Sequence, residues 1–144
     1  MAKTTMTDTL LLDSGVWVAS MSGDDRFESA ARELVADLDR RFCALDLTLY
    51  EGANAVGSKR GRFDQAASEC RAITERRAWA TVRVDGDLVE AVIEVSAGYG
   101  LTSYDAAYVA VARRYDWTLV STGIRDPVSR VSRSRRTRPS NLLV

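Results

Sequence analysis

Apolar residues form short continuous runs in some segments of the chain and helical spacings in others, and the two patterns together predict a mixed α/β fold. Four short runs have the length and composition of buried β-strands: TLLLD (9–13), FCAL (42–45), ATVRV (80–84) and TLVS (118–121). Apolar spacings of three and four residues predict amphipathic helices at about 27–40, 47–58, 63–73, 89–99 and 102–112. Because strands alternate with helical stretches, we expect a three-layer α/β/α sandwich around a central parallel sheet of four to five strands.

The first and last of these helices carry clear apolar stripes, which predict the side chains that they bury. In the first helix the stripe is Phe27, Ala30, Ala31, Leu34, Val35 and Leu38. In the last helix it is Tyr104, Ala107, Tyr108 and Val111. Asp105 is the one carboxylate in that otherwise apolar last helix, so its presence there needs an explanation.

The formal net charge of the chain is zero, but the charges are unevenly distributed. Residues 1–124 contain 14 Lys or Arg and 19 Asp or Glu, whereas residues 125–144 contain six Arg and one Asp. We expect one folded domain at 1–128 and an Arg-rich tail at 129–144, whose final NLLV could add an edge strand. The tail is interpreted either as a solvated segment or as a basic arm for RNA or an acidic partner. The acidic body does not by itself predict a nucleic-acid binder.

The chain contains no histidine and two cysteines, Cys43 and Cys70, with no CxxC pair. This composition excludes His-based zinc sites, Ser-His-Asp and Cys-His nucleophiles, and any histidine general base. Both cysteines have apolar neighbours and are expected to be buried free thiols. The N-terminal MAKTTMTD is polar, and the LLL after it is too short for a signal or membrane segment, so we expect a cytoplasmic protein.

Three acidic residues far apart in the sequence are predicted to meet at one edge of the sheet. Asp13 ends the first strand, and Glu51 lies in the first turn of the helix that leaves the second strand. Asp105 starts a helix that enters the fourth strand through a short link, so this helix and strand are antiparallel. All three acids therefore lie at the carboxyl ends of the strands, where parallel α/β proteins bind their ligands.

Helix capping is the competing explanation for two of these acids. The segments TLYEGANAV (48–56) and TSYDAAYV (102–109) share the order Thr, any residue, Tyr, acid. Each fits a capping box, in which the Thr caps the helix and the acid three residues later reaches back. No capping role is predicted for Asp13, and an acid at the end of a buried strand is costly unless it is paired or metal-bound.

An acidic cluster of this kind requires a positive counter-charge. Two carboxylates about 4 Å apart repel by roughly 4 kcal/mol at an effective dielectric constant near 20. The only lysines are Lys3 and Lys59, so a divalent cation is the natural counter-charge, and all-oxygen ligands select Mg²⁺ or Mn²⁺. Such a site can activate water and stabilise the charge on a phosphodiester, provided that arginines around it hold an RNA backbone.

Three segments carry a resemblance to a known family: LLLDSGVWVA, TLYEGANAV and LTSYDAAYVAVARRYDWTLVST. With the strand–helix order between them, they resemble PIN-domain ribonucleases over residues 9–122, specifically VapC-type toxins of toxin–antitoxin pairs. The resemblance implies that Asp13, Glu51 and Asp105 hold Mg²⁺ or Mn²⁺ and that Ser121 supplies a hydroxyl. It also implies cleavage of single-stranded regions of RNA, a homodimer, and inhibition by a VapB-type antitoxin that places an Arg in the acidic pocket.

The segment after the last strand departs from the pattern of that family. The family usually has a fourth acid two residues after the hydroxyl, where this chain has Gly123; Asp126 is a candidate substitute. The departure supports an alternative, a PIN-like RNA- or antitoxin-binding module with weak or lost nuclease activity. A phosphatase or phosphoacceptor domain is disfavoured, because Gly15 stands where the phosphatase pattern needs Asp and no Lys follows the last strand.

Overall fold

A computed structural model describes residues 8–21 and 26–122, and its elements alternate much as the sequence predicts. The strands are β1 (Thr9–Leu12), β2 (Arg41–Leu45), β3 (Ala80–Val82) and β4 (Thr118–Val120). The helices are α1 (Ser14–Met21), α2 (Glu28–Val35), α3 (Asp46–Ala53), α4 (Phe63–Ala72), α5 (Gly86–Tyr99) and α6 (Ser103–Tyr115). α3 and α4 continue into the π-helical turns η1 (Asn54–Lys59) and η2 (Ile73–Arg77). None of the helices in these two ranges has the length and apolar character needed to cross a bilayer.

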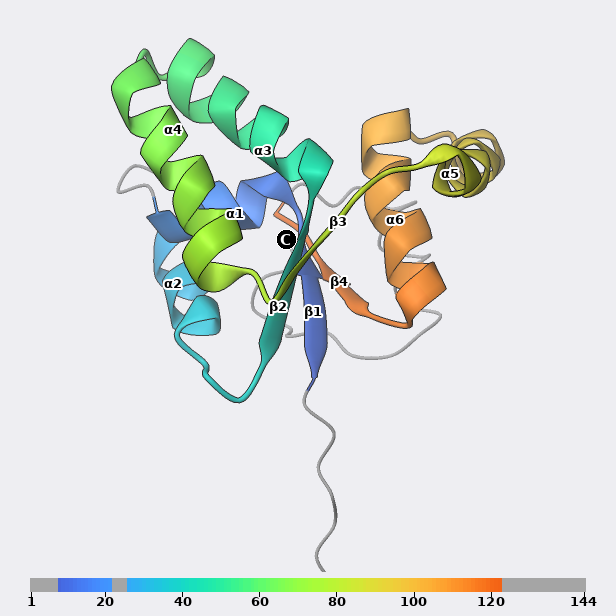
Figure 1. The fold of residues 1–144 in the computed structure, drawn as a ribbon, viewed down its shortest axis with the longest axis horizontal. Helices are drawn as coiled ribbons and strands as arrows, with labels where there is room; N and C mark the ends of the chain where they lie inside the picture. The colour runs from blue at the N-terminus through green and yellow to red at the C-terminus, as the bar shows by residue number, and fades with distance from the viewer. Residues whose placement is uncertain (1–7, 22–25, 123–144) are drawn as a thin grey trace, which may run out of the picture.

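The strands form a parallel sheet in the order β3-β2-β1-β4, which confirms the predicted fold class. β1 is central: Leu11 pairs with Cys43 of β2 on one side and with Leu119 of β4 on the other. Figure 1 shows α1, α2 and α4 on one side of the sheet and α5 and α6 on the other. The three layers of the sandwich are therefore present. The Arg-rich tail and the NLLV segment lie outside the described residues.

The side chains of β1 alternate between the two faces of the sheet and divide the core into two clusters. Leu11 belongs to the cluster under α5 and α6. Leu10 and Leu12 belong to the cluster under α1 and α2, where the Trp17 ring meets the Phe42 ring edge-on at a centroid distance of 6.5 Å. Burial on both faces explains why β1 and β2 are continuous apolar runs rather than alternating ones.

The helix α1 is not predicted from the sequence. Its sequence, SGVWVASM, is apolar on nearly every side, and Val16, Trp17, Val18 and Ala19 are all buried. A helix that is buried all round has no polar face, so the periodicity that identifies amphipathic helices is absent.

The helix α2 is shorter than predicted, and one residue of its predicted stripe is exposed. The helix ends at Val35 rather than near Arg40. Asp37 then forms a turn, in which its carboxylate accepts the Asp39 N–H at 3.0 Å and pairs with Arg40 at 3.2 Å. The predicted burial of Leu38 is therefore wrong, and its side chain is 94% exposed.

Capping residues set the boundaries of α5 and α6. The Asp85 carboxylate accepts a backbone N–H in the first turn of α5, and Gly100, with φ of 64°, ends that helix in the left-handed region. Three positions of the predicted α6 stripe are buried: Ala107, Tyr108 and Val111. Tyr104 is 61% exposed, so its predicted burial is wrong, because the whole first turn (102–105) is exposed.

The two cysteines are free thiols, as predicted. Cys43 is fully buried in β2, and burial raises the pKa of its thiol to about 11. Cys70 is only half-buried, and burial raises the pKa of its thiol as well. Because the thiolate is the reactive form, neither cysteine fits a nucleophilic role.

Truncation of the central strand should destabilise the protein. Leu11→Ala removes a fully buried side chain from the middle of the sheet, and we expect a loss of about 2–5 kcal/mol in the free energy of unfolding. The matched control is Leu38→Ala at an exposed position, where a change below about 0.5 kcal/mol is expected. Urea denaturation followed by circular dichroism measures both variants. An equal loss in the two would contradict the assignment of β1 to the core.

Candidate active site at the carboxyl edge of the sheet

Asp13 follows β1 directly, and its backbone N–H still donates to the Val120 carbonyl of β4 at 3.1 Å. Its carboxylate accepts two hydrogen bonds. Oδ1 accepts the Val16 N–H at 3.0 Å, and Oδ2 accepts the Ser121 hydroxyl. Asp13 is therefore held both by the start of α1 and by the residue that follows β4.

The contact with Val16 shows that Asp13 caps α1, which corrects the expectation that Asp13 has no capping role. A carboxylate at this position satisfies one of the backbone N–H groups that a helix leaves unpaired in its first turn. The sequence does not predict this role, because α1 itself has no amphipathic spacing. A carboxylate offers about four acceptor sites on its two oxygens, so capping leaves capacity for another ligand.

Glu51 lies in the second turn of α3, rather than in the first as predicted, and its carboxylate meets a side chain of α6. Its Oε1 accepts a 2.7 Å hydrogen bond from the Tyr108 hydroxyl. That hydroxyl lies 2.9 Å from Thr48 Oγ1, which in turn accepts the Leu45 N–H at 3.0 Å. Burial and the charge of Glu51 raise the pKa of Tyr108, so the phenol stays protonated. A chain of hydrogen bonds thus joins the end of β2 to the Glu51 carboxylate.

The capping box predicted for Thr48 and Glu51 is wrong. α3 begins at Asp46, so Thr48 is its third residue rather than its cap. Thr48 itself reaches back to the Leu45 N–H, which is the role that the sequence pattern gives to Glu51. Glu51 is therefore not occupied in capping, and its carboxylate points instead to Tyr108.

Asp105 lies in the exposed first turn of α6, one turn before Tyr108. Its backbone N–H donates to Thr102 Oγ1 at 3.2 Å, which confirms Thr102 as the cap of this helix. The second half of a capping box is not formed: within the described residues the Asp105 carboxylate accepts no hydrogen bond. This carboxylate is therefore available for a ligand at the edge of the sheet.

The charges of Glu51 and Asp105 act on the Asp13 carboxyl. The pKa of Asp13 is raised from 3.8 to about 6, chiefly because the carboxyl is buried. The hydrogen bonds from Ser121 and Val16 lower this pKa, and the negative charges of Glu51 and Asp105 raise it. Glu51 and Asp105 therefore lie near enough to Asp13 for their charges to act on its carboxyl, and the shared metal site remains a prediction.

The chemistry of the donors fits a hard divalent cation. The candidate metal ligands at this edge, Asp13, Glu51, Asp105 and Ser121, all offer oxygen atoms. A bound cation would offset the burial and repulsion that raise the pKa of Asp13. Across 8–21 and 26–122, however, no three His, Cys, Asp or Glu side chains are grouped closely enough to hold a metal ion. The donor types fit Mg²⁺ or Mn²⁺, while the carboxylates are not drawn together into a ready-made ligand set.

The residue Thr122 brings a second hydroxyl to the start of α1. A Cβ added to Gly15 would collide with the Thr122 hydroxyl, so the glycine permits this close approach. Gly123 and Asp126, on which the question of a fourth acid depends, lie outside the described residues.

Three polar residues at this edge are absent from the sequence-based candidates: Thr48, Tyr108 and Asp46. Thr48 and Tyr108 are almost fully buried, and their hydroxyls in otherwise apolar stripes are the signal that could have identified them. Asp46 directly follows β2, but its carboxylate oxygens accept the backbone N–H groups of Leu47 at 2.8 Å and Val84 at 3.3 Å. Asp46 therefore joins the start of α3 to the segment after β3.

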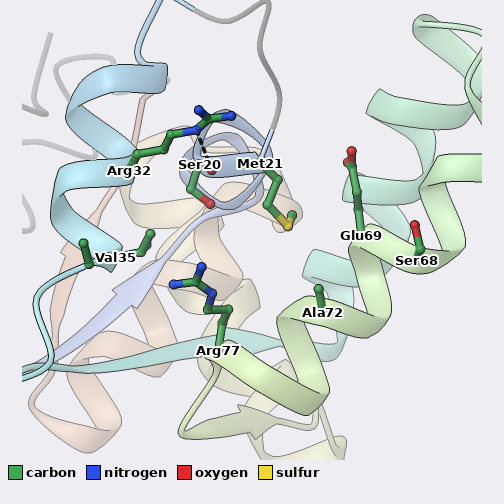
Figure 2. Close-up of a pocket in the computed structure, with 9 residues that line it drawn as sticks. Ser20, Met21, Arg32, Val35, Ser68, Glu69, Ala72 and Arg77 are labelled. Atoms are coloured by element: carbon green, nitrogen blue, oxygen red, sulfur yellow. Dashed lines mark hydrogen bonds between the residues drawn. The ribbon is translucent and has the colours of Figure 1, made fainter.

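A separate hollow of about 580 Å³ lies between α1, α2 and α4 and contains none of the predicted site residues. Figure 2 shows Arg32 donating to the Ser20 carbonyl, with Glu69 on the opposite side on α4 and Arg77 on the lower rim. Burial raises the pKa of Glu69, and its buried Oε2 accepts no hydrogen bond from the described part of the chain. The lining combines apolar side chains with the charged groups of Arg32, Glu69 and Arg77.

Comparison with known proteins places the chain by family and by fold. A family model described as the PIN domain matches residues 10–132. No curated protein matches the chain by sequence.

Solved structures with the same fold have low sequence identity to the chain. VapC20 of Mycobacterium tuberculosis, described as a sarcin-ricin loop cleaving toxin, has a TM-score of 0.70 at 19% identity, over 84% of this chain and 93% of that one. PAE2754 of Pyrobaculum aerophilum has a TM-score of 0.64 at 19% identity, over 89% and 82%. VapBC2 of Rickettsia felis, bound to a DNA fragment from their promoter, has a TM-score of 0.62 at 17% identity, over 94% and 96%. At such identities the likeness demonstrates the fold.

The raised pKa of Asp13 predicts a pH-dependent stability in the absence of divalent metal. Protonated Asp13 contributes its full stability below pH 3.8, which is the pKa of the carboxyl in the unfolded chain. This contribution is lost as the pH rises through about 6, which is its pKa in the folded protein. Asp13→Asn cannot ionise, so relative to wild type it should gain up to about 3 kcal/mol between about pH 4 and about pH 8. Denaturant unfolding with EDTA at both pH values measures the gain, and Asp64→Asn, an exposed site on α4, is the control. A relative stability that does not change with pH would contradict the burial of Asp13.

Proposed function

The chain belongs to the PIN domain family, and on that premise we propose that it is a Mg²⁺- or Mn²⁺-dependent endoribonuclease toxin of the VapC type. It would cleave single-stranded regions of RNA. The observation that carries the proposal is that the charges of Glu51 and Asp105 act on the Asp13 carboxyl, to which Ser121 donates a hydrogen bond. VapC20, which has the same fold, is described as a sarcin-ricin loop cleaving toxin, and this supports the proposed activity.

The proposed catalytic residues divide the work at the site. Asp13, Glu51 and Asp105 supply carboxylate oxygens for the cation, which when bound would activate water and stabilise charge on the phosphodiester. Ser121 is nearly buried and orients the Asp13 carboxylate through its hydroxyl. Asp13, held at Oδ1 by the Val16 N–H and at Oδ2 by Ser121, cannot turn away from the edge without losing both bonds.

Binding of the RNA backbone must come from local positive charge, because residues 1–124 are acidic overall. Arg83 follows β3, so it lies at the same carboxyl edge as the acids, and its side chain is exposed. We assign it to the phosphate backbone of the substrate. The strand ends thus supply both the acids for the cation and an arginine for the polyanion.

A second candidate function is a PIN-like module that binds RNA or an antitoxin and has weak or lost nuclease activity. Gly123 at the usual position of the fourth acid favours it. The loose grouping of the carboxylates among the described residues also favours it. The two candidates differ in whether the purified protein cleaves RNA when Mg²⁺ or Mn²⁺ is added.

Asp13→Asn and Asp105→Asn should each abolish metal-dependent cleavage of a single-stranded RNA. Changes outside the ligand shell of a metal cost 10–100-fold, so loss of a ligand should lower kcat/KM by about 100-fold or more. Asp64→Asn, with its exposed carboxylate on α4, should leave cleavage unchanged. Cleavage of a fluorescent oligonucleotide with Mn²⁺, and circular dichroism as the test of folding, measure this. Full activity in either site variant would exclude the assigned metal site, and inactivity of the wild type would favour the binding module.

The partners proposed for the toxin are a VapB-type antitoxin and a second copy of the chain. An Arg from the antitoxin would meet the carboxylates of the acidic edge and replace the cation as their counter-charge. The hollow with Arg32, Arg77 and the unpaired Oε2 of Glu69 offers further charged contacts to such a segment. The VapBC2 structure, a complex of the same fold, supports the antitoxin proposal.

Exposed apolar side chains on α3 and α5, namely Tyr50, Val89 and Ile93, offer surface for a homodimer.

Induced expression should arrest bacterial growth if the protein is a toxin. We expect arrest with wild type and normal growth with Asp13→Asn at equal protein levels, since the variant lacks a proposed metal ligand. Co-expression of a small antitoxin encoded next to the gene should restore growth. Colony counts after induction and immunoblots of the protein measure both effects. Arrest by wild type and Asp13→Asn alike would show that growth inhibition does not depend on the acidic site.

A further inference from the structure

Two hydroxyl side chains, Thr48 and Tyr108, form a series of hydrogen bonds that ends at the Glu51 carboxylate. We infer that Tyr108 and Thr48 are positioning residues, which hold the Glu51 carboxylate by one oxygen so that the other can serve the cation. The inference rests on the proposed function, because it takes Glu51 to be a metal ligand. It concerns residues that do not themselves reach the cation.

The donors and acceptors in this series of hydrogen bonds follow from the number of hydrogens that each group carries. The Leu45 N–H can only donate, and it donates to Thr48 Oγ1 at 3.0 Å. The Tyr108 hydroxyl has one hydrogen, which it donates to Glu51 Oε1 at 2.7 Å. Between Thr48 and Tyr108, 2.9 Å apart, Thr48 must therefore be the donor. Each hydroxyl accepts one hydrogen bond and donates one, and every donor points toward the carboxylate.

Both hydroxyls are held rigidly, which is what a positioning role requires. Thr48 is 0% exposed and Tyr108 is 4% exposed, and Tyr108 packs in the core cluster under α5 and α6. Glu51 is half-buried, and among the described residues only its Oε1 accepts a hydrogen bond. The long Glu51 side chain would otherwise lose rotamer entropy on binding an ion, and the Tyr108 hydroxyl reduces that loss in advance.

The helix α6 carries both a proposed metal ligand, Asp105, and Tyr108, the residue that supports a second proposed ligand. Asp105 and Tyr108 are three residues apart on α6, so they lie on one face of that helix. Tyr108 then links α6 to the Glu51 side chain of α3 by the 2.7 Å bond. The hydrogen bond from Tyr108 to Glu51 therefore helps to set the spacing between the Glu51 and Asp105 carboxylates.

Tyr108→Phe removes the donor to Glu51 while it keeps the buried ring. We expect the Kd for Mn²⁺, measured by isothermal titration calorimetry on the purified full chain, to rise about 10-fold or more. The kcat for RNA cleavage at fixed subsaturating Mn²⁺ should fall by a similar factor, with KM for RNA unchanged. Tyr115→Phe is the matched control, since it deletes a phenol hydroxyl at the exposed far end of α6, where the ring stacks on Trp117. It should change neither quantity.

Substitutions at Thr48 separate positioning from a purely structural effect. Thr48→Ser keeps the hydroxyl and should retain the wild-type Mn²⁺ affinity, whereas Thr48→Val has nearly the same shape and should weaken it in the direction of Tyr108→Phe. Melting temperatures of all variants show which of them are folded. If Tyr108→Phe fails to fold, the comparison of Thr48→Ser with Thr48→Val decides.

The outcomes distinguish this inference from the proposed function. Wild-type binding and cleavage with an unchanged Mn²⁺ Kd in Tyr108→Phe would overturn the positioning role and leave the nuclease proposal standing. Equal losses in Thr48→Ser and Thr48→Val would also overturn it. A wild type that neither binds Mn²⁺ nor cleaves RNA would overturn the nuclease proposal and this inference with it.

Discussion

The half-buried Asp13 carboxylate, at the end of the central strand, constrains the residues around it. β1 is paired on both sides and its leucines are buried, so Asp13 enters the edge of the sheet already partly removed from water. Burying a carboxylate costs free energy unless hydrogen bonds or a cation compensate. The start of α1 supplies one such bond through Val16, and Ser121 supplies the other. The same residue therefore begins a helix, fixes the residue after β4, and leaves a negative charge where two further acids meet it.

Much of the fold follows from periodicity, and its exceptions have local physical causes. The long helices are visible because burial on one face imposes a spacing on the sequence, and the central strands are visible as short, continuous apolar runs. α1 is not visible, since a helix between the sheet and α2 has no polar side to create that spacing. Leu38 is a misleading continuation of the α2 stripe, because the turn formed by Asp37 ends the helical path before Leu38 can reach the core. Periodicity thus records burial, and it carries no information where burial is complete or where a turn intervenes.

The site is predictable to the extent that it depends on topology. In a parallel sheet every strand ends at the same edge, so Asp13, Glu51 and Asp105 could be brought together without any knowledge of packing. The support for Glu51 is different in kind, because Thr48 and Tyr108 are 60 residues apart and meet through a hydrogen bond between α3 and α6 that no local pattern predicts. The capping pattern around Thr48 misled for a related reason. The motif is correct in type, but the start of α3 at Asp46 shifts the roles of its residues by one turn.

Capping and metal binding need not compete for the same carboxylate, and this bears on how the acidic edge can be stable before an ion binds. Asp13 gives one acceptor site on each oxygen to Val16 and Ser121, and Glu51 gives one oxygen to Tyr108. Those hydrogen bonds offset part of the free-energy cost of burial and charge repulsion. The raised pKa of Asp13 reflects the part of that cost which they do not offset. That remaining cost is the part which a cation, or an arginine of a partner, can offset. Because many functions share one fold, this unbalanced charge rather than the fold itself is the stronger argument for a ligand at the edge.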